Sequence, residues 1–160
     1  MSKLNVSDIQ GFAIRGYNMP LARYCFLRFT SAERARALLA KLLPVVTTGQ
    51  LWDKKPQSVV NLAFTYRGFV ALELPLATLV SFPVEFQLGM KARAGILGDT
   101  GANAPEHWES LWQEGDVHAW LAINAMSPEA LEAQFQAVRA LLESTSGARC
   151  WSERRMLRPC

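Results

Sequence analysis

Two strand-then-helix units constrain the fold of this chain more than any other feature of its sequence. In the second unit, the apolar run 117–123 is strand-like and residues 124–126 form the expected turn. Ser127 then follows as an N-cap and Pro128 as the first helical residue, where its missing N–H is no loss. Apolar residues recur every three or four positions after it, which predicts a helix over 128–143: Leu131, Phe135, Val138 and Leu142.

The first unit has the same pattern near the N-terminus. Residues 21–29 are a strand candidate, Ser31 is placed as an N-cap, and Pro44 ends the helix that follows. The apolar face of this helix comprises Ala35, Leu38, Leu39 and Leu42. A chain with two such units needs a sheet on which both helices can pack.

Two further strands complete the sheet. Residues 59–66 alternate in polarity, with Gly68 expected to end the strand, and residues 148–156 are the fourth candidate. The order is βαββαβ, which is the ferredoxin-like pattern of an α+β domain. Residues 67–115, rich in helix and loop signals, form an insertion between the second and third strands. We therefore expect one ferredoxin-like domain over 1–160.

Composition limits the possible partners. Half of the 160 residues are hydrophobic and the net charge is only +3, an excess that residues 149–158 can supply with Arg149, Arg154, Arg155 and Arg158 against Glu153. A basic tail this short does not predict a nucleic-acid partner. No apolar run has the roughly 18 residues of a membrane span, and the first residues lack the apolar stretch of a secretory signal. A cytoplasmic location is the expectation.

Three cysteines without a C-x-x-C pair predict neither a disulfide framework nor a structural zinc site. Cys25, in the middle of a strand, is most simply a small buried hydrophobe. Cys160 is expected to be exposed.

One face of the predicted sheet has no assigned cover. Val117, Ala119, Leu121 and Ile123 would face the helices, whereas His118, Trp120, Ala122 and Asn124 would lie opposite, together with Val59, Asn61, Ala63 and Thr65. A face that met only water would be more polar. We expect this second face, including Val59, Trp120 and Ala122, to meet the inserted helices, a second domain or another subunit. Trp52, Trp108 and Trp112 are expected to pack on the core.

No catalytic constellation is visible in the sequence. Phosphate-binding glycine motifs and the G-x-S-x-G elbow are absent, and His107 and His118 are the two imidazoles. His107 lies between Glu106 and Glu109, but a transition metal there would lack a second strong ligand. A surface position for His107 and a packed, hydrogen-bonded position for His118 beside Trp120 are the simpler interpretations. We assign no catalytic, cofactor-binding or metal-binding residue.

Five stretches together resemble the N-terminal half of a dye-decolourising (DyP-type) haem peroxidase, from about residue 8 to about 143. They are Asp8-Ile-Gln-Gly11, Val60-Asn-Leu-Ala-Phe-Thr-Tyr66, Phe82-Pro-Val-Glu-Phe86 with Gly89-Met90, Leu97-Gly-Asp-Thr-Gly101, and Pro105-Glu-His-Trp108. The resemblance implies a module of the dimeric α+β barrel superfamily and, in the full-length family, a haem that uses hydrogen peroxide to oxidise dyes or aromatic compounds.

The departures from the family limit what can be carried over. The Gly-x-x-Asp-Gly motif with the family's distal aspartate is missing, and no histidine follows His118 to act as the proximal ligand. The haem-ligating C-terminal module is absent from this chain. The resemblance thus implies an N-terminal module, truncated or stand-alone, that binds no haem and is inactive by itself. Two alternatives are a non-catalytic assembly module that dimerises through its sheet, and a small cofactor-free α+β barrel enzyme with His107 or His118 as base.

Overall fold

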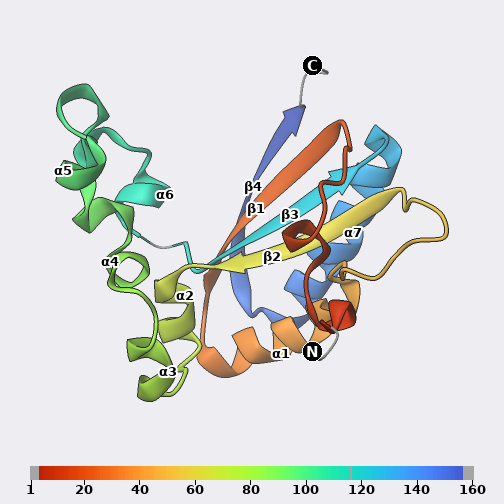
Figure 1. Ribbon diagram of the computed structural model, residues 1–160, viewed down its shortest axis with the longest axis horizontal. Coiled ribbons are helices and arrows are strands. Elements are labelled where there is room, and N and C mark those ends of the chain that lie inside the picture. The colour runs from red at the N-terminus through yellow and green to blue at the C-terminus, as the bar shows by residue number, and fades with distance from the viewer. Residues whose placement is uncertain (1–3, 116, 157–160) are drawn as a thin grey trace.

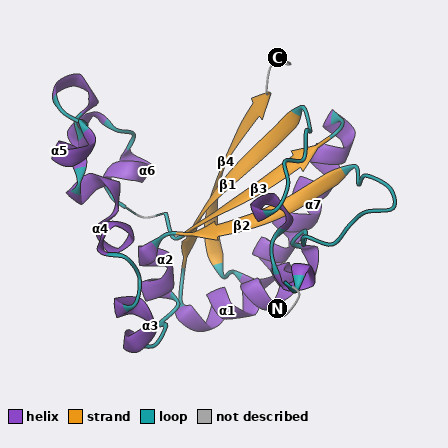
Figure 2. Ribbon diagram, in the orientation of Figure 1, coloured by secondary structure: helices purple, strands orange, loops and turns teal. Residues whose placement is uncertain are grey.

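The computed structural model describes residues 4–115 and 117–156 and contains a four-stranded antiparallel sheet (Figures 1 and 2). The strands are β1 (Leu21–Phe29), β2 (Ser58–Phe64), β3 (Ala119–Ala125) and β4 (Ala148–Met156). They lie in the order β2-β3-β1-β4, and each neighbouring pair is antiparallel. This is the sheet order that two βαβ units produce, so the predicted ferredoxin-like α+β fold is confirmed.

Two long helices, α1 (Ala32–Leu42) and α7 (Pro128–Thr145), cover one face of the sheet, as Figure 1 shows. Both begin where the sequence predicts. The Ser31 side chain accepts a hydrogen bond from the Arg34 N–H, and that of Ser127 accepts one from the Ala130 N–H. Each cap satisfies a backbone donor that has no partner inside its helix.

The hydrophobic core lies between this helical layer and the sheet. Its fully enclosed residues include Cys25, Leu27, Leu38, Leu121, Ile123 and Val138. Phe135 is half-buried and packs at the border of the core, beside the guanidinium of Arg23 at 4.0 Å from the ring centroid. Arg23 is itself only 5% exposed, and its Nη2 lies 2.8 Å from Glu132 Oε2 on α7. The helix-facing side of β1 therefore carries one buried cation with both an aromatic and a carboxylate partner.

The insertion between β2 and β3 is helical, as predicted, and consists of α2 (Tyr66–Ala71), α3 (Leu76–Val80), α4 (Val84–Ala92), α5 (Ala94–Leu97) and α6 (Ser110–Gln113). In Figure 1 these green helices lie to the side of the sheet and not over it. An aromatic stack joins them to the sheet, since the ring centroid of Phe69 lies 5.2 Å from that of Phe64 in β2 and 5.1 Å from that of Phe82. None of the helices in the described ranges is long and apolar enough to cross a membrane.

The corner where the insertion leaves the sheet differs from the prediction. Strand β2 ends at Phe64, because Thr65 becomes the N-cap of α2 and accepts a hydrogen bond from the Gly68 N–H. Tyr66 is therefore helical, and Gly68 does not end a strand. It lies inside α2, where a Cβ atom at Gly68 would be 1.9 Å from the His118 carbonyl oxygen. Only glycine allows the helix to approach the sheet this closely.

The predicted limits of the third strand are also wrong by two residues at each end. Val117 and His118 precede β3, and their carbonyl groups accept hydrogen bonds from Thr65, that of Val117 from Oγ1 and that of His118 from the backbone N–H. At the other end, Asn124 and Ala125 are not a turn. They continue the ladder opposite Ala22 and Leu21.

The two edges of the sheet are unequal. Along β2, the Thr47 N–H donates to the Val60 carbonyl and Thr47 Oγ1 accepts from the Val60 N–H. The Gln10 side chain bonds to both backbone groups of Leu62, at 2.7 and 2.8 Å. Strand β4 pairs with β1 on one side, and no second strand joins it in the described part of the chain. One edge of the sheet is thus closed by polar contacts, and the other is available for pairing.

Candidate functional site

The second face of the sheet is covered at one end by the chain itself. Val59 is 1% exposed and Asn61 6% exposed, and the Asn61 side-chain amide donates to Gln10 Oε1. Trp52 lies against Tyr17 and Arg15 of the N-terminal segment, not against the core as expected. The expectation that Val59 needs another subunit or domain to cover it is therefore wrong, because the segment before β1 and the loop before β2 already enclose this end.

The remainder of this face is open and aromatic. We define the open aromatic face as Tyr24, Phe26, Trp120 and Trp151, which come from β1, β3 and β4. The ladder places Phe26 directly between Trp120 and Trp151, and Tyr24 contacts Trp120 edge-on at 5.3 Å. Trp120 is 42% exposed and Trp151 40% exposed. Large aromatic side chains in adjacent positions on an uncovered sheet are typical of a surface that packs against a partner.

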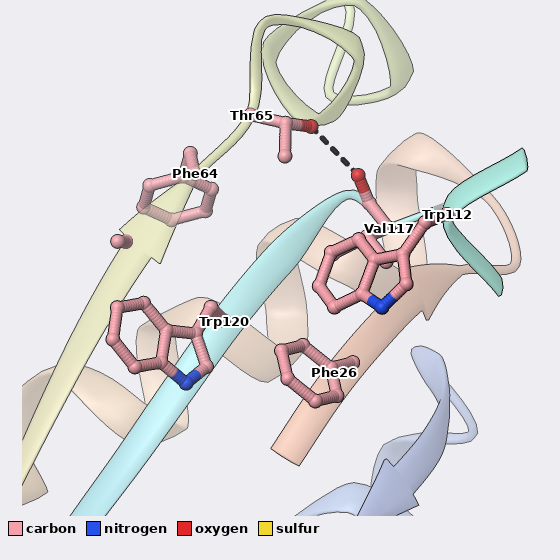
Figure 3. A pocket seen from close by; sticks show the side chains of 7 residues that line it. Phe26, Phe64, Thr65, Trp112, Val117 and Trp120 are labelled. Carbon is pink, nitrogen blue, oxygen red and sulfur yellow. Dashed lines mark hydrogen bonds between the residues drawn. The ribbon is translucent and has the colours of Figure 1, made fainter. Parts of the chain in front are cut away.

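A pocket of about 200 Å³ lies where the insertion meets this face. Figure 3 shows Trp112 of α6 over Phe26, with Trp120 on the sheet beside them. The rings of Trp112 and Phe26 are in edge-to-face contact, with their centroids 4.9 Å apart. Ala63, Phe64, Thr65 and Val117 complete the lining. Trp112 thus packs on the second face and not on the core. It remains 41% exposed, so the pocket is apolar but open to solvent.

The two histidines occupy different surroundings. His107 is exposed in a short 3-10 turn (Pro105–His107), the surface position that the sequence favours. His118 is packed and hydrogen-bonded, as expected. Its Nδ1 accepts the Phe29 N–H at 3.0 Å, and the ring partner that the structure shows is Phe29 of the core cluster. This bond holds the imidazole at the insertion corner.

Other sequence candidates add no second site. Trp108 packs within the insertion, where its indole N–H donates to the Asn103 carbonyl. Arg149 is exposed on β4, whereas the side chains of Arg154, Arg155, Arg158 and Cys160 lie outside the described residues. Within the described ranges, no three His, Cys, Asp or Glu side chains gather as a metal site would require. Sequence reasoning placed Trp120 on this second face through the alternation of the third strand, but it did not identify Tyr24, Phe26, Trp151 or Trp112 as parts of the site.

Fold and face together define an α+β domain whose sheet is covered by two long helices on one side and leaves aromatic side chains exposed on the other. A family profile described as the DyP dimeric alpha+beta barrel domain matches residues 8–149. The chain belongs to this family, as the sequence motifs predict. The comparison with curated proteins returned no match.

Solved structures support the same fold. An ancestral D-type dye decolorizing peroxidase superposes with a TM-score of 0.80 and 24% identity over 99% of this chain. The decolorizing peroxidase of Auricularia auricula-judae gives a TM-score of 0.78 with 19% identity over 98% of this chain. The alignments cover 36% and 34% of those proteins, so this chain spans about a third of their length.

The pocket beside Trp112 does not fit a haem. Haem iron in proteins is held by His, Cys, Met or Tyr, and none of these lines the pocket beside Trp112. Its volume of about 200 Å³ is also below the range of roughly 300–1,000 Å³ that is usual for small-molecule sites. None of the residues that line this pocket could therefore act as an axial ligand of haem iron.

Proposed function

We propose that this chain is the N-terminal module of a DyP-type haem peroxidase and has no peroxidase activity alone. In the complete protein, haem would use hydrogen peroxide to oxidise dyes or aromatic compounds. The observation that carries the proposal is the open aromatic face, on which Trp120 and Trp151 keep 42% and 40% of their surface exposed. A sheet with this surface is half of a sandwich, and the other half is a second ferredoxin-like module.

The insertion supports the same conclusion. Several of its apolar side chains face solvent: Leu76, Val80, Val84, Leu88, Met90 and Ile96, each between 54% and 82% exposed. Single exposed apolar residues are normal, but a run of them along consecutive short helices indicates surface that a partner covers. The partner would be either the remainder of a longer polypeptide or a second copy of this chain.

The role of the chain would be to supply packing surface, since no residue that lines the pocket beside Trp112 could ligate a haem iron. The non-catalytic assembly module remains the second candidate, and the same open aromatic face favours it. The cofactor-free enzyme is less well supported, because His118 Nδ1 already accepts the Phe29 N–H and His107 is an exposed residue of a 3-10 turn.

A hemin assay separates these functions. With equimolar hemin and hydrogen peroxide, we expect the chain to oxidise a dye no faster than hemin alone, because peroxide cleavage requires an axial ligand and a positioned proton-transfer group. The measurements are dye bleaching and the Soret absorbance. A stoichiometric Soret complex that turns over well above free hemin, and that loses this turnover in His107→Ala or His118→Ala, would contradict the proposal.

Assembly provides a second prediction. At micromolar concentration we expect light scattering to show a dimer or larger species, because burying the open aromatic face removes apolar surface from water. Trp120→Glu should shift the chain to monomer by placing a charge in that interface. Leu51→Glu is the matched control, since Leu51 is 91% exposed in the loop before β2 and lies outside this face. A wild-type chain that stays monomeric throughout this range would contradict self-association.

A further inference from the structure

Two cysteine thiols lie side by side where β4 pairs with β1. Cys25 is opposite Ser152 and Leu27 is opposite Cys150, so the two cysteines are diagonal neighbours on the same face of adjacent strands. The register of β1 and β4 therefore places the two side chains next to each other. Cys25 is completely buried in the core cluster, whereas Cys150 is exposed. Cys150 is thus open to reagents in solution, whereas Cys25 is shielded from them.

The two thiols are also chemically unequal. Hydrogen bonding with Cys150, together with burial, raises the pKa of the Cys25 thiol. The same bond lowers the pKa of Cys150, because it stabilises the thiolate. The thiolate is the nucleophilic form of cysteine, so the exposed residue is the reactive one.

We propose that Cys150 and Cys25 form a peroxide-responsive thiol pair, with Cys150 as the attacking sulfur and Cys25 as the resolving sulfur. The Cys150 thiolate attacks one oxygen of hydrogen peroxide, the O–O bond breaks, and a sulfenic acid and hydroxide form. Cys25 then gives its proton to the departing hydroxyl as its sulfur attacks the sulfenic sulfur, the S–O bond breaks, and the oxygen leaves as water. In sum, two thiols lose two electrons, peroxide gains them, and a disulfide closes between β1 and β4.

The edge position of β4 makes this closure feasible. Diagonal neighbours across an antiparallel pair have Cα atoms about 7–8 Å apart, and disulfides span at most about 6.8 Å. Strand β4 must therefore move toward Cys25 by about 1 Å. Because β4 has β1 as its strand neighbour in the described sheet, this movement does not disturb a second ladder.

The test uses the full chain with Cys160→Ser, so that the remaining cysteines are the pair in question. After treatment with stoichiometric hydrogen peroxide, thiols are blocked with an alkylating agent in denaturant, and the protein is analysed by intact mass, peptide mapping and a non-reducing gel. We expect loss of two hydrogen atoms in mass, no alkylated cysteine, a Cys25–Cys150 cross-linked peptide, migration as a monomer, and complete reversal by dithiothreitol.

Two variants in the same background assign the roles. In Cys25→Ala, Cys150 should retain an added oxygen or form intermolecular disulfides, whereas in Cys150→Ser, Cys25 should stay unreacted. Circular dichroism checks that both variants are folded. If either is unfolded, the oxidation of the Cys160→Ser chain still tests the proposal. The proposal is overturned if the parent chain shows oxygen added to Cys150 with Cys25 still alkylatable, only intermolecular disulfides, or no reaction.

Discussion

Replacing Gly68 with alanine is expected to lower the free energy of unfolding by at least about 3 kcal/mol. The added Cβ would lie 1.9 Å from the His118 carbonyl oxygen, and the nearby atoms are backbone that cannot rotate away. Helix α2 would have to withdraw from the sheet, which breaks the hydrogen bonds that Thr65 makes to Val117 and His118. Denaturant unfolding followed by circular dichroism measures the change.

The matched control for this substitution is Gly95→Ala in the same insertion. No atom lies within 4 Å of the Cβ position at Gly95, which is in α5. Alanine there should be neutral or slightly stabilising, by up to about 1 kcal/mol, because it favours the helical backbone. Equal midpoints for Gly68→Ala and the wild-type chain would mean that α2 does not approach the sheet as closely as described.

The second large effect concerns the buried cation of β1. Glu132→Ala should destabilise the chain by about 2–4 kcal/mol, because Arg23 is 5% exposed and would lose its carboxylate partner at 2.8 Å. The double variant Arg23→Met, Glu132→Ala should recover most of this loss, since a methionine side chain fills the space beside Phe135 without a charge. Thermal or denaturant unfolding of the two variants tests whether removing Glu132 alone costs more stability than removing both charged partners.

A surface ion pair on the same helix serves as the control. Arg139 and Glu143 are 2.7 Å apart, with side chains 57% and 64% exposed, so Glu143→Ala should change stability by at most about 0.5 kcal/mol. If Glu132→Ala behaves like Glu143→Ala, or if the double variant is less stable than Glu132→Ala alone, burial of Arg23 is not what makes this pair important.

The elements that sequence reasoning located correctly are those with local signals. Ser31 and Ser127 are N-caps as predicted, and the alternation of β3 separates its buried residues from Trp120. What the sequence could not locate depends on contacts between distant segments. Thr65 continues the polarity of β2, yet its hydroxyl bonds to Val117 and to the Gly68 N–H, and these bonds turn the chain into α2.

The candidate site shows the same division. The position of Trp120 on the second face follows from the period of the strand, but the other aromatic residues of that face and its extent were not predicted. Val59 is enclosed by segments that carry no strand pattern, and Trp112 reaches Phe26 from an irregular part of the insertion. The pairing of Cys25 with Cys150 likewise requires the register of β1 and β4, which only the assembled sheet fixes.

The unequal edges of the sheet determine how far this domain could polymerise. With Gln10 and Thr47 occupying the β2 edge, the described part of the sheet offers one edge for strand addition, that of β4. Two copies joined by that edge would form a two-fold pair in which both β4 edges are used, so strand addition would stop there. Removing the segment that contains Gln10 would open the β2 edge as well. With two open edges, head-to-tail strand addition could continue into fibres. The hydrogen bonds that Gln10 and Thr47 make along β2 therefore limit strand addition to one edge of the described sheet.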